Sequence, residues 1–258
     1  MQLTRRGFSL FELLIIFAVI AILLGLLLPA FQKVRETSNR IKCANNLHQI
    51  GLAGLNYLTD KRARFPAAIP GPDAKNDLTF FASILPYIEQ DNLWKVVQEA
   101  DNSVWQSNVF ARPLATFSCP TDTSAEKDQL FQGWLATSNY AANYLTFGTS
   151  GIRIDDIKDG TSNTMILTER FQICNGTPCA WAYSEATEWA PVFAYSSYEK
   201  FQLNPSPCNP ALAQSSHLGI INVGMADGSV HSVSKTISPQ TWYYLCTPAG
   251  NEVITEAF

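Results

Sequence analysis

The sequence predicts an α+β protein, in which a long N-terminal transmembrane helix extends into a head with an antiparallel β-sheet and short helices. Three observations support this prediction. Residues 8–60 hold one helical pattern, apolar in its first half and amphipathic in its second. After Pro113, short runs of β-branched and aromatic residues alternate with turn residues. Near the C-terminus, Asp227 and Gly228 lie between two alternating segments, the pattern of a tight hairpin.

The apolar run covers residues 8–31, and its only charged residue is Glu12. At roughly 1.5 Å per residue, a helix over this run is about 36 Å long and crosses the roughly 30 Å hydrocarbon core of a bilayer. Arg5 and Arg6 precede the run, and basic residues favour the cytoplasmic side. We therefore expect a single-pass inner membrane protein with a cytoplasmic N-terminus and a periplasmic or cell-surface head.

Residues 5–12, Arg-Arg-Gly-Phe-Ser-Leu-Phe-Glu, resemble the cleavage and methylation site of type IV prepilins and type II secretion pseudopilins. The resemblance implies a cytoplasmic leader over residues 1–7, cut after Gly7 by a prepilin peptidase that then methylates Phe8. For Glu12 it implies a role in assembly, pairing with the terminal ammonium of a neighbouring subunit. The two arginines also look like a twin-arginine export signal, but the long apolar run without a small-residue cleavage site argues against that reading.

Residues 32–60 are expected to continue the helix as an amphipathic segment. Prolines and a basic tract over residues 61–72 then end the helical pattern, so the head is expected to occupy residues 61–258 as one domain. The helix face predicted to pack on this head carries apolar and small residues at three- and four-residue steps: Val34, Ile41, Ala44, Leu47, Gly51, Leu55 and Leu58.

Short elements are expected within the head. Residues 78–90 and 92–100 have the pattern of short helices. Ser238 followed by Pro239 is typical of a helix start, which predicts a last short helix ending near Leu245. The predicted strands of a meandering sheet are residues 115–118, 139–147, 164–168 and 180–183, and the hairpin of residues 219–234.

His217 introduces a second resemblance. Nine residues separate it from Asp227 and Gly228, which is similar to the histidine, nine residues, Asp-Gly signature of prepilin-like proteins. Four further motifs in the chain look like a planctomycete prepilin-like family of unknown function: FSCPTD, SNYAANY, IKDGTSNTMILTER and WYYLCTPAGNEVI.

Two roles are open for the signature. In an enzyme, His217 would be a general base oriented by Asp227, with Ser215, Ser216 or Ser229 as the nucleophile. In a structural role, the histidine locks a loop by a hydrogen bond or an ion pair. We favour the structural role because the chain has no nucleophile elbow of the G-x-S-x-G type.

The six cysteines favour an oxidising compartment, where disulfides form. Cys174 and Cys179 flank a predicted turn and are the most credible local pair. The remaining pairing stays open, because six cysteines allow fifteen connectivities. Zinc ligation is the alternative, and it is disfavoured because the chain has no C-x-x-C motif and only three histidines.

A cluster of acids, Asp155, Asp156 and Asp159, offers the oxygen ligands that calcium prefers. The alternative is a turn at Asp159 and Gly160, which we favour because a lysine lies within the cluster. Calcium is therefore the only cofactor for which the sequence gives any indication.

Aromatic residues of the head form either a surface for a sugar or protein partner or part of the core, and we favour the core. These residues are Trp181, Tyr183, Trp189, Tyr195 and Tyr198. The net charge of −4 argues against nucleic acid as a main ligand.

The sequence thus predicts a prepilin-like structural subunit rather than an enzyme, assembled through its N-terminal helix in a type II secretion or type IV pilus-like apparatus. The implied partners are a prepilin peptidase, other pilin-like subunits and inner membrane lipid. The alternative is a membrane-anchored extracytoplasmic binding or enzymatic domain that does not polymerise.

Overall fold

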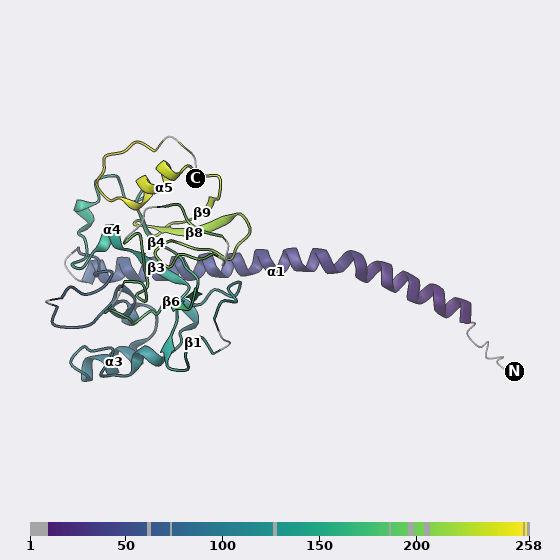
Figure 1. Ribbon diagram of the computed structural model, residues 1–258, viewed down its shortest axis with the longest axis horizontal. Coiled ribbons are helices and arrows are strands. Elements are labelled where there is room, and N and C mark those ends of the chain that lie inside the picture. The colour runs from purple at the N-terminus through teal and green to yellow at the C-terminus, as the bar shows by residue number, and fades with distance from the viewer. Residues whose placement is uncertain are drawn as a thin grey trace.

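The computed structural model describes residues 10–60, 63–72, 74–125, 128–185, 187–195, 199–203, 207–254 and 256. One long helix, α1, runs out of an α+β head, and the start of this helix lies far from the head (Figure 1). The predicted leader and its cleavage site at Gly7 and Phe8 lie outside the described residues.

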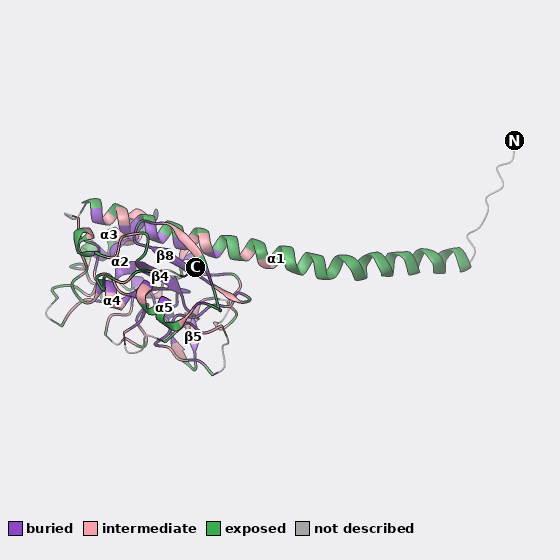
Figure 2. Ribbon diagram, turned by 90° about the horizontal axis from the view of Figure 1, so that it is seen from above, coloured by how far each residue is buried: buried purple, intermediate pink, exposed green. Residues whose placement is uncertain are grey.

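Helix α1 (Leu10–Asp60) is continuous over 51 residues and contains Pro29. Its first half projects from the head and is exposed on all sides, whereas the second half lies against the head (Figure 2). Burial begins at Cys43. The predicted face is buried or partly buried from Ala44 onward. The prediction is wrong at Val34 and Ile41, which are 66% and 54% exposed because the head packs only on the end of the helix.

The head contains a five-stranded sheet with the strand order β7-β3-β4-β8-β9. Its pairs are antiparallel except β3 and β7, which run parallel, so the predicted antiparallel sheet is a mixed one. Two small hairpins accompany it, β1 with β2 and β5 with β6. The strands are β1 (Leu130–Phe131), β2 (Leu135–Ala136), β3 (Tyr140–Asn143), β4 (Met165–Glu169), β5 (Ile173–Cys174), β6 (Thr177–Pro178), β7 (Val192–Phe193), β8 (Ile220–Met225) and β9 (Val230–Ser234).

The other helices are short. They are α2 (Phe80–Ser83), α3 (Asp91–Glu99), α4 (Tyr144–Phe147), α5 (Pro239–Cys246) and the 3-10 helices η1 (Leu85–Tyr87), η2 (Val109–Ala111), η3 (Ala115–Phe117) and η4 (Ile154–Asp156). The strand predicted over residues 115–118 is thus wrong, since η3 lies there. The strand predicted over residues 139–147 stops at Asn143, because its side chain accepts a hydrogen bond from the Leu145 amide and starts α4. Residues 180–183 form a turn after one isolated β-bridge.

Helix α1 and helix α5 cover opposite faces of the sheet, and each face has its own apolar core. Strand β8 shows the alternation that this arrangement requires. Its residues Ile221, Val223 and Met225 belong to the core that contains Trp242 of α5. On the α1 side, a side chain at Gly224 would meet Leu47 at 3.0 Å, so this glycine allows the helix to approach the sheet closely.

The hairpin and the last helix form as predicted. Strands β8 and β9 pair in register around Asp227 and Gly228, and Gly228 has a positive φ of 86°. The side chain of Ser238 accepts a hydrogen bond from the amide of Thr241, and Pro239 follows it as the first residue of α5.

The predicted disulfide between Cys174 and Cys179 is wrong. Cys174 is bonded to Cys208, with a Cα to Cα distance of 5.6 Å, and Cys179 is a buried free thiol, as is Cys246. The register of the small β5–β6 hairpin explains the difference, because it places Cys174 opposite Thr177 and leaves Cys179 two residues further along. The other disulfide joins Cys43 to Cys119.

Candidate functional site

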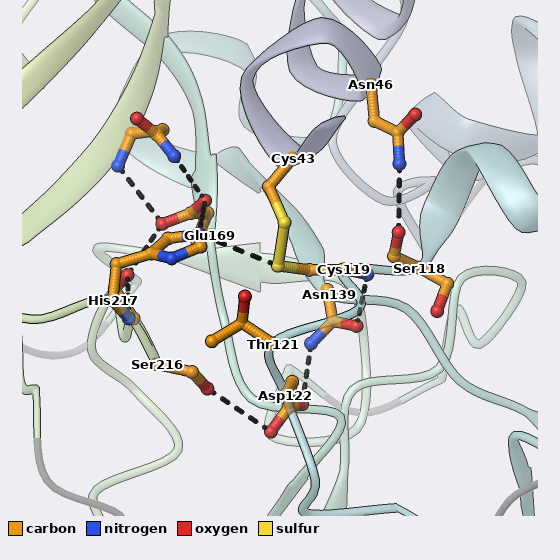
Figure 3. The surroundings of a disulfide bond; sticks show 12 residues. Cys43, Asn46, Ser118, Cys119, Thr121, Asp122, Asn139, Glu169, Ser216 and His217 are labelled. Atoms are coloured by element: carbon orange, nitrogen blue, oxygen red, sulfur yellow. Dashed lines mark hydrogen bonds and ion pairs between the residues drawn. A yellow bond between two sulfur atoms is a disulfide. The ribbon is translucent and has the colours of Figure 1, made fainter. Parts of the chain in front are cut away.

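His217 lies in the segment before β8 and bridges the head to helix α1. Its Nδ1 is 2.8 Å from Oε1 of Glu36 on α1, and its Nε2 is 3.3 Å from Oε1 of Glu169 at the end of β4. The side chain of His217 is only 1% exposed. Figure 3 shows the imidazole against Glu169, beside the disulfide of Cys43 and Cys119. We call the contact between α1 and these residues the helix–head junction.

Glu169 is a buried carboxylate whose oxygens are fully engaged. The hydroxyl of Ser215 donates to Oε2 at 2.7 Å, and the backbone amide of Asn222 donates to the same oxygen at 3.1 Å. The side-chain amide of Asn222 donates to Oε1 at 2.7 Å. Burying a carboxylate costs free energy unless hydrogen bonds and an opposite charge compensate it, and here both are present.

The two carboxylates determine the charge of His217. Burial by itself lowers the pKa of the imidazole, but the hydrogen bonds and charges of Glu169 and Glu36 outweigh it, so the pKa of His217 is raised. Both ring nitrogens face carboxylate oxygens, and an imidazole can donate from both only when it is protonated. The protonated form of His217 therefore places one cation between two carboxylates at the junction.

A disulfide also joins α1 to the head at this junction. Cys43 belongs to α1, and Cys119 belongs to the head segment that follows η3. The hydroxyl of Tyr140 donates to the backbone carbonyl of Cys43 at 3.2 Å. Burial and the charge of Glu169 raise the pKa of Tyr140 well above its usual value, so this phenol remains a hydrogen-bond donor.

The junction also has the geometry of a metal site. Ligand atoms of Cys43, Cys119, Glu169 and His217 lie within 4.8 Å of one another. The two sulfur atoms, however, are bonded to each other, and a metal ligand must be a thiolate. With the disulfide closed, these residues do not fit a zinc ion.

The second half of the signature contacts α1 at a different place. The Nδ1 of His48 donates to the carbonyl of Gly228 at 2.8 Å. A side chain at Gly228 would lie 2.9 Å from Leu55 Cδ1, and the Gly228 Cα lies 3.8 Å from where a Cβ of Gly51 would be. Gly228 thus fits the surface of the helix because it has no side chain.

His217 and Asp227 do not pair with each other, so the catalytic hypothesis that joins them is wrong in its geometry. They lie at opposite ends of β8, and Asp227 accepts hydrogen bonds from the amide and the hydroxyl of Ser229. The signature instead marks the two ends of one strand, each of which contacts α1. His217 reaches Glu36, and the Gly228 turn reaches His48.

The acidic loop contributes to the fold through Asp159. Its carboxylate accepts hydrogen bonds from the backbone amides of Gly250 at 2.8 Å and Asn251 at 2.6 Å, which tie the C-terminal segment to the loop. Asp155 lies 3.7 Å from Arg153, and Asp156 ends η4. Among the described residues, the group placed closely enough to share a metal ion does not include these aspartates, and calcium binding there stays a prediction.

The five aromatic residues considered as a binding surface do not share one role. Trp181 is fully buried and donates its indole N–H to the carbonyl of Arg112 at 3.0 Å. Tyr183 and Trp189 contact each other, with ring centroids 5.2 Å apart, and Tyr195 packs on the larger core. Tyr198 lies outside the described residues.

The sequence alone does not reveal the partners of His217. Glu36 lies on the polar face predicted to meet solvent, and only the fold brings it to a histidine 181 residues later. Glu169 does carry a signal, because it is a charged residue ending the apolar strand Met165–Glu169. A charge in that position is expected to be paired when the strand is buried.

The fold and the junction define a class of protein. It has an α+β head that is joined to a long helix by a disulfide and by the contact of His217 with Glu36. The helix is long and apolar enough to cross a membrane. Residues 32–240 match a family described as protein of unknown function (DUF1559), and the chain belongs to this family. The match begins just after the apolar half of α1. No curated protein and no solved structure matches the chain.

Proposed function

We propose that this protein is a prepilin-like structural subunit, processed after Gly7 and assembled through residues 8–31 in a type II secretion or type IV pilus-like apparatus. The main support is the continuity of α1, whose apolar half is exposed while its other half belongs to the core of the head. A helix that is apolar on all sides is stable in lipid or against other apolar helices. Lateral contacts of this kind would build a filament from the N-terminal segments.

The helix–head junction supports this role mechanically. In an assembly held together by helix contacts, the head keeps a defined orientation only if it is fixed to its own helix. The disulfide of Cys43 and Cys119 bonds the helix covalently to the head. The ion pair of Glu36 and His217 joins them at a position nearer the apolar segment of the helix. Both constraints act on α1 close to the point where it leaves the head.

The proposed location has separate support. Two disulfides are favoured on the oxidising side of a membrane, which agrees with a periplasmic or cell-surface head. Arg5 and Arg6 before the apolar run favour a cytoplasmic N-terminus.

The proposed role requires no reaction at the junction. Both ring nitrogens of His217 face carboxylate oxygens, and in its protonated form the imidazole has no lone pair with which to act as a general base. The hydroxyls of the three candidate nucleophiles donate to carboxylates: Ser215 to Glu169, Ser216 to Asp122 and Ser229 to Asp227.

Processing is tested by the intact mass of the protein extracted from membranes. We expect the chain to lack residues 1–7 and to carry one methyl group on Phe8. A Gly7→Val variant should keep the full mass. Gly25→Ala is the control, because it changes a glycine of the neighbouring apolar segment with open space around it. A parent that retains residues 1–7, as the Gly7 variant does, would refute the prepilin assignment.

Assembly is tested by replacing Glu12 with Gln and measuring crosslinked multimers in the membrane. We expect the multimers to disappear although the protein remains processed, because the carboxylate that pairs with a neighbouring terminal ammonium is gone. Glu99→Gln in α3 is the control, since it removes one charge from the head. Unchanged multimers would contradict assembly through Glu12, and a solitary processed chain would favour the membrane-anchored binding domain instead.

A further inference from the structure

A pocket with a volume of about 350 Å³ lies where the end of α1 meets η1 and α3. Tyr57 of α1, Tyr87 of η1 and Trp94 of α3 form its aromatic walls. Asp60 is the only charged residue among the described residues that line it. The volume is at the lower end of the roughly 300–1,000 Å³ typical of small-molecule sites.

The aromatic walls surround a compact space rather than a flat one. The rings of Tyr57 and Tyr87 are nearly perpendicular, at 79°, with centroids 6.1 Å apart. The hydroxyl of Tyr87 donates to Oδ2 of Asp60 at 2.9 Å, which places a carboxylate at the edge of the aromatic walls. Burial and the neighbouring Asp60 raise the pKa of Tyr87 to about 12, so the phenol stays protonated and keeps this hydrogen bond.

We propose that this pocket binds an alkylammonium group, either a quaternary ammonium or a lysine side chain. The faces of aromatic rings attract cations, and indole does so most strongly. Perpendicular rings surround a roughly spherical cation on more than one side, whereas a sugar ring stacks flat on one aromatic face. The carboxylate of Asp60 adds the complementary negative charge at the rim.

The place of the pocket restricts the source of the ligand. Tyr57 follows Phe31 by 26 positions along α1, which corresponds to about 39 Å at 1.5 Å per residue. A lipid headgroup at the end of the apolar segment does not reach that far. The ammonium group therefore belongs to a soluble small molecule or to another protein, and the pocket is independent of the assembly proposed above.

The test uses the full chain in a maltoside detergent, which has no ammonium group of its own. Isothermal titration calorimetry compares choline with 3,3-dimethylbutanol, its neutral isostere. We expect saturable binding of choline, about tenfold tighter than binding of the alcohol, because only the cation interacts with the ring faces and Asp60. N-acetyl-lysine methylamide, titrated in parallel, shows whether a lysine side chain is the better source. The absence of saturable binding by both cations would overturn the proposal.

Variants separate a cation site from an apolar hollow. Asp60→Asn keeps the shape of an exposed side chain and should weaken choline binding at least about fivefold, with little effect on the alcohol. Trp94→Leu should weaken it about tenfold by removing one aromatic wall. Asp91→Asn, an exposed carboxylate of α3 that does not line the pocket, should leave binding unchanged. Thermal midpoints confirm that each variant is folded.

The proposal fails if choline and its neutral isostere bind equally, because the site is then an apolar hollow. It also fails if Asp60→Asn has no more effect than Asp91→Asn. Neither result would bear on processing after Gly7 or on assembly through Glu12.

Discussion

The Nδ1 of His217 lies 2.8 Å from a carboxylate oxygen of Glu36, a residue 181 positions earlier in the chain. This contact joins the long helix to the segment that leads into β8, and Glu169 holds the other nitrogen of the same ring. Because the histidine is buried between two acids, the free energy of this contact depends on its proton.

Replacing His217 with Ala should lower the free energy of unfolding by about 3–5 kcal/mol, because Glu169 is then buried without a cation. Urea unfolding of the full chain in detergent, followed by near-ultraviolet circular dichroism of the head, measures the change. His48→Ala is the control, since this exposed ring makes one hydrogen bond to Gly228 and should contribute about 1 kcal/mol or less. Equal losses in the two variants would contradict a buried ion pair at His217.

The stabilisation by His217 should depend on pH. A histidine of the unfolded chain titrates near pH 6.5, and the pKa of folded His217 is raised above that value. Such a group stabilises the fold fully below about pH 6.5, and the contribution is lost as the pH rises through the folded pKa. The difference in unfolding free energy between the parent and His217→Gln should therefore be largest at low pH and shrink above about pH 6.5.

Glu36→Gln provides the matched test of that pH dependence. It removes one of the two carboxylates that raise the pKa of His217, so the loss of stability should occur at a lower pH than in the parent. A difference between parent and His217→Gln that stays constant or grows with pH would show that protonation of His217 does not stabilise the fold.

The disulfide pairing predicts how the thiols react. The denatured, unreduced chain should take up two alkyl groups, at Cys179 and Cys246, because the other four cysteines are bonded in pairs. Before denaturation both thiols should resist alkylation, since burial raises the pKa of Cys179 to about 11 and hides the sulfur atoms of both. Mass mapping of unreduced peptides checks the pairs, and a peptide linked through Cys174 and Cys179 would refute them.

Gly228→Ala should destabilise the head by about 1–3 kcal/mol. The substitution carries a backbone penalty at its positive φ and places a methyl group 2.9 Å from Leu55 of α1. Gly176→Ala is the control, because Gly176 also has a positive φ but has no atom near its missing side chain, so that only the backbone penalty applies. Thermal unfolding compares them. A second substitution, Leu55→Ala, should partly restore Gly228→Ala, and additive losses would contradict contact between the turn and the helix.

Local sequence patterns predicted the elements whose formation depends on residues close together in the chain. The periodicity after residue 31 predicted the continuous helix α1, and Asp227 and Gly228 predicted the hairpin of β8 and β9. Ser238 and Pro239 predicted the start of α5. The strand predicted over residues 115–118 failed because its composition suits a strand while its backbone forms a turn of 3-10 helix.

The helix–head junction could be predicted only in part. The spacing of His217 and Asp227 singled out the right segment but suggested the wrong relationship. The two residues lie beyond opposite ends of β8, and α1 is contacted by His217 at one end and by Gly228 at the other. Likewise, Cys174 is bonded to a cysteine 34 residues away and not to the nearby Cys179.

The sequence by itself determined a long N-terminal helix, apolar and then amphipathic, followed by an α+β head with a tight C-terminal hairpin. The tertiary structure alone decided which charges meet in the interior, which cysteines bond, and how far along α1 the head reaches. The physical reason is range. Helical periodicity and turn geometry are set by residues a few positions apart, whereas the Glu36 to His217 ion pair and the Cys43 to Cys119 bond join segments 181 and 76 positions apart. Such contacts exist only once the sheet has packed on the helix.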